Sequence, residues 1–359
     1  MRQVPAHGGP AARDGRAPPQ NRTVSTGVPH RTPGYAAIDL GTNNCRLLIA
    51  RPEGEQLIVV DAFSRIVRLG EGLQASGVIS AAAMDRAVGA LAICADKLRR
   101  RHVRLSRAVA TEACRRARNG AELVERVRRE TGILLDVIDA AEEARLAVLG
   151  CHSLLEAGEG PALIFDIGGG STELMLIGES GGRVAIDDWV SIPWGVVSLT
   201  EFAPVADNSG DARRAAYARM RAVTGEALAD FARRAAQRHG GKPLRLLGTS
   251  GTVTTLASVF LELPRYDRRA VDGLAVPAEA MRSISRTLAE ASMEERATFG
   301  CIGRERADLV VAGCAILESI MDLWPATRVG VADRGIREGI LRTLAGFDGQ
   351  IPVVRRGMP

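Results

Sequence analysis

The residues with the clearest chemical potential run from Asp166 to Glu173, with the sequence Asp-Ile-Gly-Gly-Gly-Ser-Thr-Glu. Apolar residues precede and follow them, which predicts a strand, a tight turn and a returning strand. We expect the three glycines to let the turn adopt positive φ and to bring backbone N–H groups close to a ligand. Such a nest of N–H groups, with the hydroxyls of Ser171 and Thr172 beside it, suits an anion and above all a phosphate.

Asp166 and Glu173 bracket this turn with carboxylates, which would repel a bare phosphate. The two acids make chemical sense if a divalent cation lies between the protein and the phosphate. The alternative is a plain Gly-rich hairpin, in which the glycines have only a structural role. Taken alone, this stretch leaves both interpretations open.

The same pattern recurs near the start of the chain, where Asp39 to Asn44 separate two apolar runs. In this comparison Asp39 corresponds to Asp166, and Gly41 corresponds to Gly168. Two copies of one hairpin indicate an internal duplication.

Length and composition fit a globular protein of two ordinary domains. The chain has 359 residues, of which 46% are hydrophobic and 25% are charged, as in typical soluble proteins. The net charge is +5, but residues 1–34 alone contain five arginines and one aspartate. The charge is therefore weak evidence for nucleic-acid binding. These first residues are rich in Pro, Gly and Arg, which predicts a disordered tail.

Several classes of protein are excluded by missing patterns. No apolar stretch is long enough to cross a membrane, and an aromatic content of 4% does not support base stacking with nucleic acids. Neither of the two lysines of the chain lies in a P-loop motif. The five histidines form no metal-binding pair and no catalytic triad. The six scattered cysteines lack a C-x-x-C pair, which predicts a cytoplasmic location.

Strands alternate with helices along the chain, which predicts an α/β class with two similar lobes and a cleft between them. A duplicated fold usually binds its ligand in such a cleft. We expect strands at 35–38, 46–50, 56–67, 105–110, 134–138, 163–165, 174–177, 184–192, 244–247 and 328–331, and helices at 80–101, 122–130, 141–156, 211–239, 252–260, 277–290, 307–321 and from 333 onward.

Five motifs in one order resemble the exopolyphosphatase / guanosine pentaphosphate phosphatase (Ppx/GppA) family. They are Ala37 to Asn43, Glu142 to Leu146, Asp166 to Glu173, Gly248 to Thr252 and Asp333 to Gly339. The resemblance extends from about Tyr35 to about Leu344. It implies two ribonuclease H-like lobes of the actin-like ATPase and sugar kinase superfamily, hydrolysis of terminal phosphates, and dependence on Mg²⁺.

The resemblance also implies roles for individual residues. Glu143, the second glutamate of its motif, is expected to activate water, although an acid at a helix start is otherwise typical of a solvated position. Arg115 is expected to contact phosphate, to which a guanidinium fork is well suited. The expected metal ligands are Asp166, Glu173 and Asp39, and the expected phosphate contacts are Gly41, Thr42, Asn43, Asn44, Gly168, Gly169, Gly170, Ser171, Thr172, Ser250, Gly251 and Thr252.

The expected domains follow from the same comparison. We predict a tail at 1–34, a first lobe at 35–145 completed by a helix at about 333–345, a second lobe at 146–332, and a tail at 346–359. Long members of the family carry a further helical region with a His-Asp motif, and this sequence has no His-Asp pair. The chain therefore resembles the short, two-lobe form. Family members often dimerise, so a homodimer is an expectation of the resemblance.

The sequence therefore predicts a Mg²⁺-dependent exopolyphosphatase that hydrolyses the terminal phosphate of inorganic polyphosphate. Conversion of guanosine pentaphosphate to the tetraphosphate is the alternative within the family. An ATPase or kinase of the same fold, and a non-catalytic binder of polyphosphate or of a phosphorylated guanosine nucleotide, are alternatives of other classes. The basic stretches 97–107 and 113–129 either steer a polyanion or form solvated helix faces.

Overall fold

The computed structural model describes residues 34–54, 56–155, 160–180, 183–207, 209–346 and 353–354. The predicted N-terminal tail lies outside these ranges except for Gly34, and the predicted C-terminal tail does so except for residues 346, 353 and 354. Residues 157–161, for which the sequence Ala-Gly-Glu-Gly-Pro predicts a linker, also lie outside them up to residue 159. The described chain forms two mixed sheets with helices around them, which confirms the α/β class.

The first sheet contains β1 (Gly34–Leu40), β2 (Asn44–Glu53), β3 (Gln56–Ile66), β4 (Val103–Ala110) and β5 (Leu135–Val137). Their spatial order is β3-β2-β1-β4-β5. β2 pairs antiparallel with both β1 and β3, whereas β1, β4 and β5 run parallel. Since helices cover both faces of its centre, β1 and β2 carry near-continuous apolar runs instead of alternating patterns.

The second sheet repeats this arrangement. It contains β6 (Ala162–Ile167), β7 (Thr172–Ser180), β8 (Arg183–Ile192), β9 (Arg245–Thr249) and β11 (Arg328–Ala332) in the order β11-β9-β6-β7-β8, extended by β10 (Ala275–Pro277) and β12 (Val353–Val354). β6, β7 and β8 are antiparallel, and β6, β9 and β11 are parallel. Both sheets thus share one strand order, as the repeated hairpins predict.

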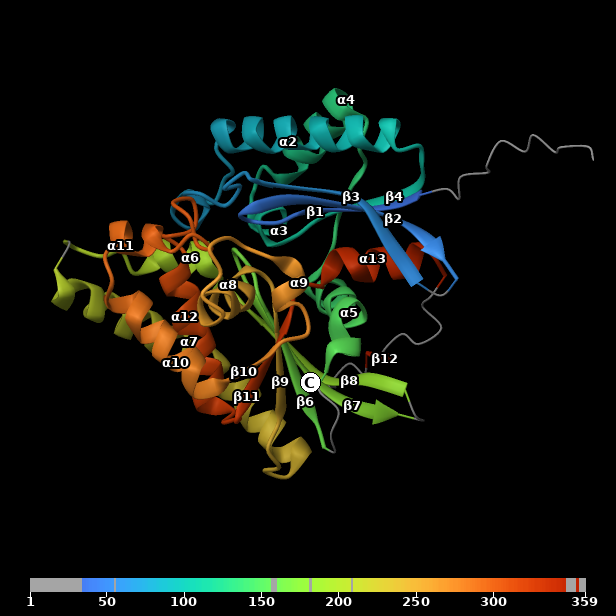
Figure 1. Ribbon diagram of the computed structural model, residues 1–359. Coiled ribbons are helices and arrows are strands. Elements are labelled where there is room, and N and C mark those ends of the chain that lie inside the picture. Colours follow the sequence, from blue (N-terminus) through green and yellow to red (C-terminus); the bar gives the residue numbers. More distant parts are fainter. Residues whose placement is uncertain are drawn as a thin grey trace, which may run out of the picture. The chain divides into compact units, whose positions relative to one another are not determined.

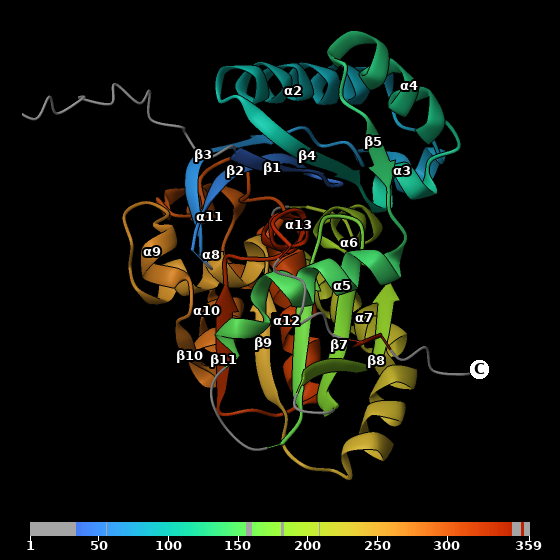
Figure 2. The ribbon, with the colours of Figure 1, turned by 90° about the vertical axis from the view of Figure 1, so that its right-hand side faces the viewer.

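The helices lie in three layers, which alternate with the two sheets (Figure 1). α2 (Ala81–Arg100) and α4 (Gly120–Thr131) cover the outer face of the first sheet. α5 (Ala140–Cys151) and α13 (Ile336–Leu344) lie between the sheets (Figure 2). α7 (Gly210–His239), α8 (Gly251–Phe260), α10 (Ala278–Glu290) and α12 (Val310–Leu323) cover the far side of the second sheet.

The short helices were harder to predict than the long ones. The sequence also predicts a helix-like stretch that follows Thr111 and contains Arg115, and α3 (Glu112–Arg116) confirms it. The helices that were not predicted are α1 (Leu73–Ser76), α6 (Val196–Phe202), α9 (Arg268–Val271) and α11 (Met293–Thr298). The last helix begins at Ile336 and not at Asp333. The reason is that the Glu338 side chain accepts the Gly335 N–H at 3.0 Å, which fixes the helix start after Gly335.

The two middle helices hold the sheets together through contacts between their backbones. A Cβ on Gly150 of α5 would lie 2.0 Å from the carbonyl oxygen of Gly335, and a Cβ on Gly339 of α13 would lie 2.1 Å from that of Leu146. Only glycine permits this approach. The predicted division between lobes at residue 145 falls within α5, and it stays a prediction.

Two further observations concern membrane-spanning helices and the state of the cysteines. Within the described ranges, no helix combines the length and the apolar composition that a membrane crossing requires. All six cysteines are buried as free thiols.

We expect Gly150→Ala to destabilise the protein by about 1–3 kcal/mol or more, because the added methyl group would overlap the Gly335 backbone. Gly89→Ala is the matched control, since Gly89 lies in α2 with open space around its Cα. This control should stabilise by about 0.5–1 kcal/mol through helix propensity. Urea unfolding of both variants checks the prediction, and effects of the same sign would contradict it.

Candidate active site

A cleft opens between the carboxyl-terminal ends of strands from the two sheets, and it holds about 1160 Å³ of space, its open mouth included. Three turns contribute most of its wall, with residues from the segments before α12 and α13 on the remaining side. The predicted site residues that line it are Asp39, Gly41, Thr42, Asn43, Asn44, Glu143, Asp166, Gly168, Gly169, Gly170, Ser171, Glu173, Ser250, Gly251 and Thr252. The structure therefore brings together all predicted site residues except Arg115 and Thr172.

The first turn joins β1 to β2 and is closed by a hydrogen bond from the Gly41 N–H to the Asn44 carbonyl at 2.9 Å. Asp39 lies at the end of β1, opposite Arg46 in β2. In the described part of the chain, the Oδ1 atoms of Asp39, Asn43 and Asn44 are buried without a hydrogen-bond partner. Buried polar atoms normally have partners, so three orphaned oxygens at one turn indicate that a ligand supplies them.

The second turn departs from the expectation of positive φ, because none of the residues Gly168–Gly170 adopts it. These glycines are needed instead for close approach. A Cβ on Gly169 would lie 2.9 Å from the Thr42 Cβ, and a Cβ on Gly170 would lie 2.7 Å from the Thr42 Oγ1 and 3.0 Å from the Glu112 Cγ. The two turns therefore touch each other directly, and any side chain on Gly169 or Gly170 would push them apart.

Thr172 does not reach the cleft. Its side chain is fully buried, and its hydroxyl donates to the Trp194 carbonyl at 2.7 Å. The neighbouring Ser171 does line the cleft. Since alternate residues of a strand face opposite sides of the sheet, Glu173 returns to the cleft side, where its Oε1 accepts a hydrogen bond from Ser191 at 2.8 Å.

The third turn connects β9 to α8 and contains a strained residue. Ser250 has φ 78° and ψ −172°, a region that is nearly restricted to glycine and costs about 1–3 kcal/mol. Its hydroxyl donates to the Ile167 carbonyl, so it does not cap α8. The first N–H groups of α8 consequently remain free at the cleft wall, where they can bind an anion.

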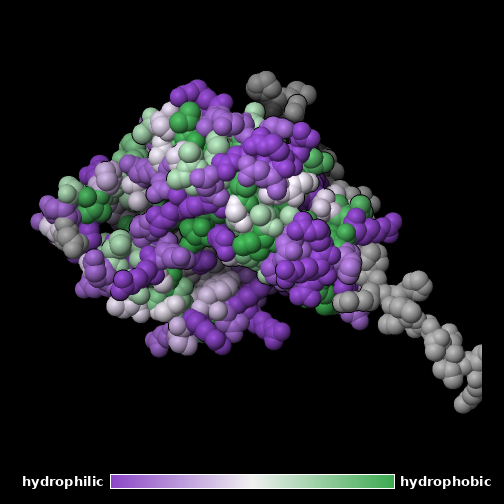
Figure 3. All heavy atoms as spheres, turned by 90° about the horizontal axis from the view of Figure 1, so that it is seen from above, coloured by the Kyte–Doolittle hydropathy of each residue, from purple (hydrophilic) through white to green (hydrophobic). Residues whose placement is uncertain are grey.

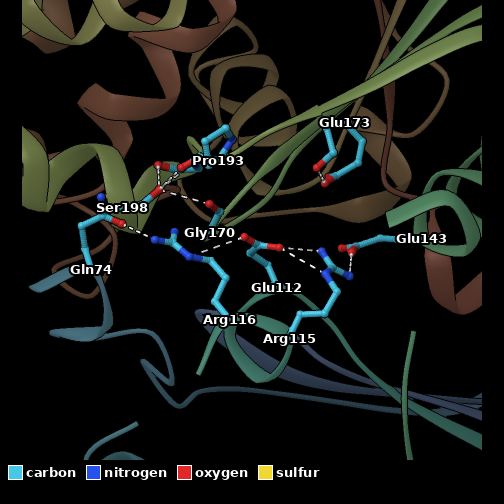
Figure 4. Close-up of polar contacts among 11 residues, drawn as sticks. Gln74, Glu112, Arg115, Arg116, Glu143, Gly170, Glu173, Pro193 and Ser198 are labelled. Atoms are coloured by element: carbon cyan, nitrogen blue, oxygen red, sulfur yellow. Dashed lines mark hydrogen bonds and ion pairs between the residues drawn. The ribbon is translucent and has the colours of Figure 1, made fainter. Parts of the chain in front are cut away.

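Glu143 lies in the first turn of α5, 7% exposed and fixed by Arg115 (Figure 4). The Arg115 Nη1 donates to the Glu143 Oε2 and to the Ile138 carbonyl, both at 2.8 Å. Its Nε and Nη2 donate to the Oε2 of Glu112 at 3.2 and 2.7 Å. The guanidinium is thus engaged by the protein and orients Glu143, while the predicted contact of Arg115 with phosphate stays a prediction.

Glu142 points elsewhere, because successive helix residues differ by about 100° in direction. Its carboxylate accepts hydrogen bonds from Arg107 at 2.8 Å and from Arg145 at 2.6 and 2.9 Å. Of the two neighbouring glutamates, only Glu143 therefore faces the cleft.

Four buried acids of the cleft have raised pKa values. Burial raises the pKa of Asp166 to about 6, and burial together with the charge of Asp166 raises the pKa of Glu173 to about 7. Burial and then the charge of Glu173 raise the pKa of Glu143 well above its usual range, and burial also raises the pKa of Asp39. These carboxylates destabilise one another, so a bound cation would stabilise all of them.

Several cleft residues were not predicted from the sequence. Arg46, Arg306 and Arg337 line the cleft, as do Thr111 and Glu112. Arg46 had a signal in the sequence, since it is a charged residue inside the otherwise apolar run of β2. Glu112 had a weaker signal in the sequence. It lies three residues before Arg115, and side chains at this spacing are neighbours on a helix.

The basic stretches 97–107 and 113–129 supply no cleft residue. Figure 3 shows the face above α2 as mostly hydrophilic, with scattered hydrophobic patches. Lys97 and Arg101 pair with Asp61 at 2.9 and 2.8 Å, and Arg126 pairs with Asp85 at 2.7 Å. These local acid partners favour the interpretation as a solvated surface.

Comparison with known proteins gives consistent matches. Residues 48–346 match the model of the Ppx/GppA phosphatase family. Exopolyphosphatase 2 of Mycobacterium tuberculosis is 30% identical, over 87% of this chain and 98% of that protein. A guanosine-5'-triphosphate,3'-diphosphate pyrophosphatase of Aeromonas hydrophila is 29% identical, over 88% of this chain and 60% of that protein.

Solved structures show the same relationship. The crystal structure of an exopolyphosphatase from Cytophaga hutchinsonii has a TM-score of 0.77 and 26% identity, covering 90% of this chain and all of that one. The Ppx/GppA family member of Aquifex aeolicus has a TM-score of 0.69 and 27% identity, covering 88% of this chain and 99% of that one.

The raised pKa of Glu173 gives the protein a characteristic pH dependence. A carboxyl group whose pKa is raised from 4.5 to about 7 on folding stabilises the fold below about pH 4.5, and this contribution is lost as the pH rises through 7. The free energy of unfolding should therefore fall between pH 5 and pH 8, with up to about 3 kcal/mol due to Glu173. We expect Glu173→Gln to show a smaller fall.

Thermal unfolding across this pH range, in a buffer free of divalent cations and phosphate, measures the difference. Glu279→Gln removes a charge from an exposed side chain and serves as the control, which should follow the wild type. Parallel pH profiles for the wild type and Glu173→Gln would contradict the assignment.

Proposed function

The chain belongs to the Ppx/GppA phosphatase family, and we propose that it is an exopolyphosphatase that hydrolyses the terminal phosphate of inorganic polyphosphate. The single observation that carries this proposal is the cleft in which the turns at Gly41–Asn44 and Gly168–Ser171 and the free end of α8 face the buried Glu143. The turns suit phosphates, and the glutamate suits a water molecule. The relative named exopolyphosphatase 2, which this chain covers almost completely, supports the same activity.

Binding of the substrate relies on backbone groups. The N–H groups of Gly41 and Gly168 close the two turns by donating to the carbonyls of Asn44 and Ser171. The other N–H groups of these turns, and those at the start of α8, are fixed before the substrate arrives. Preorganised donors of this kind need no reorganisation during the reaction, which makes them effective in stabilising charge. The hydroxyls of Ser171 and Thr252 add side-chain donors.

Glu143 acts as the general base. Its raised pKa makes the carboxylate a better proton acceptor than an exposed glutamate. It takes a proton from the attacking water, whose oxygen forms a bond to the terminal phosphorus. The bond from that phosphorus to the bridging oxygen breaks, and the bridging oxygen remains on the shortened chain with the electron pair. Phosphoryl transfer of this kind depends on positioning and on charge stabilisation.

Magnesium fits the donor set of the cleft. Among the described residues, no three His, Cys, Asp or Glu side chains form a ready metal cluster, so substrate oxygens and water would complete the coordination, as is usual for Mg²⁺. Asp39, Asp166 and Glu173 would hold the ion, and the unpartnered Oδ1 of Asp39 supports this role. When bound, Mg²⁺ supplies positive charge next to the phosphates.

Guanosine pentaphosphate is the second candidate substrate, because the relative from A. hydrophila carries the name of a phosphatase for that nucleotide. The cleft favours polyphosphate over it. The described residues that line the cleft include no Phe, Tyr or Trp, and a nucleobase usually stacks on such side chains. A cytoplasmic location and a homodimer stay predictions.

Phosphate release tests the proposed substrate. The purified chain should release phosphate from polyphosphate with Mg²⁺, and the rate should fall to background with a chelator. Guanosine pentaphosphate and ATP should give lower kcat/KM values. Turnover of ATP without any of polyphosphate would indicate an ATPase or kinase, and binding of polyphosphate without release would indicate a non-catalytic binder.

Glu143→Gln should lower kcat about a hundred- to ten-thousand-fold, the range expected for a lost general base. Binding of polyphosphate should persist, because the substitution keeps the shape of the side chain. Glu142→Gln is the matched control, since Glu142 is its neighbour and faces Arg107 and Arg145. The control should stay within about twofold of the wild type, as expected for a surface ion pair. Near wild-type turnover by Glu143→Gln would show that the base is another group.

A further inference from the structure

A row of alternating charges ends at the proposed base (Figure 4). Its central member is Glu112, the first residue of α3, whose Oε2 accepts hydrogen bonds from the Nε and Nη2 of Arg115 at 3.2 and 2.7 Å. Arg115 donates in turn from Nη1 to Glu143 at 2.8 Å. On the other side, the Arg116 Nε lies 3.9 Å from the Glu112 Oε1, and the Arg116 Nη2 donates to Gln74 at 2.8 Å. A single guanidinium therefore joins Glu112 to the base.

The Arg115 guanidinium is held along two edges. Its Nη1 donates to Glu143 and to the Ile138 carbonyl, both at 2.8 Å. Among the described residues, only Glu112 accepts hydrogen bonds from the Nε and Nη2 edge. Charge-assisted contacts to several nitrogens of one guanidinium fix its orientation as well as its position. Without Glu112, both remaining contacts would involve Nη1, and the guanidinium plane would be free to turn about that nitrogen.

The surroundings make these contacts strong. The side chains of Glu112, Arg115 and Glu143 are 15%, 20% and 10% exposed, so salt and solvent screen them little. Burial works against the charge of Arg115, but the carboxylates of Glu143 and Glu112 outweigh it and raise the pKa of Arg115. Arg115 therefore stays charged, and it is shared between the proposed base and a second acid.

Glu112 is itself held in place by the second turn. A Cβ on Gly170 would lie 3.0 Å from the Glu112 Cγ, so the turn packs directly against this side chain. Glu112 follows β4 of the first sheet, whereas Gly170 precedes β7 of the second sheet. The approach of the two sheets and the orientation of the Arg115 guanidinium thus depend on one contact.

We propose that Glu112 is a positioning residue of the reaction, which holds the Arg115 guanidinium so that Nη1 keeps the Glu143 carboxylate directed at the attacking water. Glu112 acts through Arg115, and it neither takes the proton from the water nor binds the phosphate. This inference rests on the proposed exopolyphosphatase function and on Glu143 as its base. Phosphoryl transfer depends on an oriented nucleophile, so a base that loses its orientation costs rate and not substrate binding.

Kinetics of Glu112 variants test the positioning role. Glu112→Ala should lower kcat on polyphosphate about tenfold to a hundredfold, the range expected when a catalytic group is displaced by about 1 Å. KM should change little, because an interaction that matters only in the transition state lowers kcat and kcat/KM equally. Glu112→Gln keeps an oxygen that can accept from Arg115, and it should lose less activity than Glu112→Ala. A lower KM with an unchanged kcat would show that Glu112 only repels the substrate, and would overturn the proposal.

Glu125→Ala is the matched control. Glu125 forms the same kind of pair with an arginine three residues later, Arg128, at 2.8 Å, but both side chains are exposed on α4. Neither residue lines the cleft. The kcat of this variant should stay within about twofold of the wild type, as expected for a surface ion pair. A loss equal to that of Glu112→Ala would contradict a specific role of Glu112.

A double-mutant cycle decides whether Glu112 acts through Arg115. In the Arg115→Met background, Glu112→Ala should cause no further loss of kcat, because the group that Glu112 positions is absent. A loss by the same factor in both backgrounds would mean that Glu112 acts on the substrate directly, and the proposal would be wrong.

Crystal structures of the wild type, Glu112→Ala and Glu125→Ala separate this inference from the proposed function. In Glu112→Ala alone, the contact between the Arg115 Nη1 and the Glu143 Oε2 should lengthen or divide among several conformers. Glu112→Gln takes its place if Glu112→Ala fails to fold. An undisturbed contact at 2.8 Å in a single conformer would rule out the positioning role. If the wild type released no phosphate, the proposed function would fail, while these structures would still decide whether Glu112 orients Arg115 and Glu143.

Discussion

The contact between the turns at Gly41–Asn44 and Gly168–Ser171 is the constraint on which the site depends. Gly169 and Gly170 pack against Thr42 at distances that leave no room for a Cβ. Each of the two turns is held by its own sheet, since β1 pairs with β2 and β6 pairs with β7. The backbone donors of both turns can therefore face one ligand, although more than a hundred residues separate them in the chain.

Bringing these turns together concentrates acids in a small volume. Asp39, Asp166, Glu173 and Glu143 are all largely buried, and burial raises the pKa of each. The free protein is consequently less stable near neutral pH than the same fold without these acids would be. Active sites often accept such a loss of stability, because the groups that destabilise the free protein bind the substrate and its cation. The strained φ of Ser250 fits the same pattern.

The elements that could be predicted from the sequence are those that a short run of neighbouring residues specifies. The two hairpins, the strand–turn–helix at Gly248–Thr252 and the long helices are each specified by a run of neighbouring residues, and the structure contains all of them. What the sequence could not predict depends on approach between distant segments. The glycines at 168–170 suggested positive φ, but none of them adopts it, and Gly169 and Gly170 are instead in close contact with Thr42. Likewise, Arg46 and Arg337 reach the cleft from different parts of the chain, and no local pattern joins them.

The positions of Glu143 and Arg337 are linked by the two middle helices. Glu143 lies in the first turn of α5, and Arg337 lies in the first turn of α13. Contacts of Gly150 with Gly335, and of Gly339 with Leu146, lock the two backbones together. The separation between the first turns of α5 and α13, and hence between the backbones of Glu143 and Arg337, is therefore set by packing of the two helix backbones. Glycine contacts between the two helices thereby fix the backbone positions from which Glu143 and Arg337 reach the cleft.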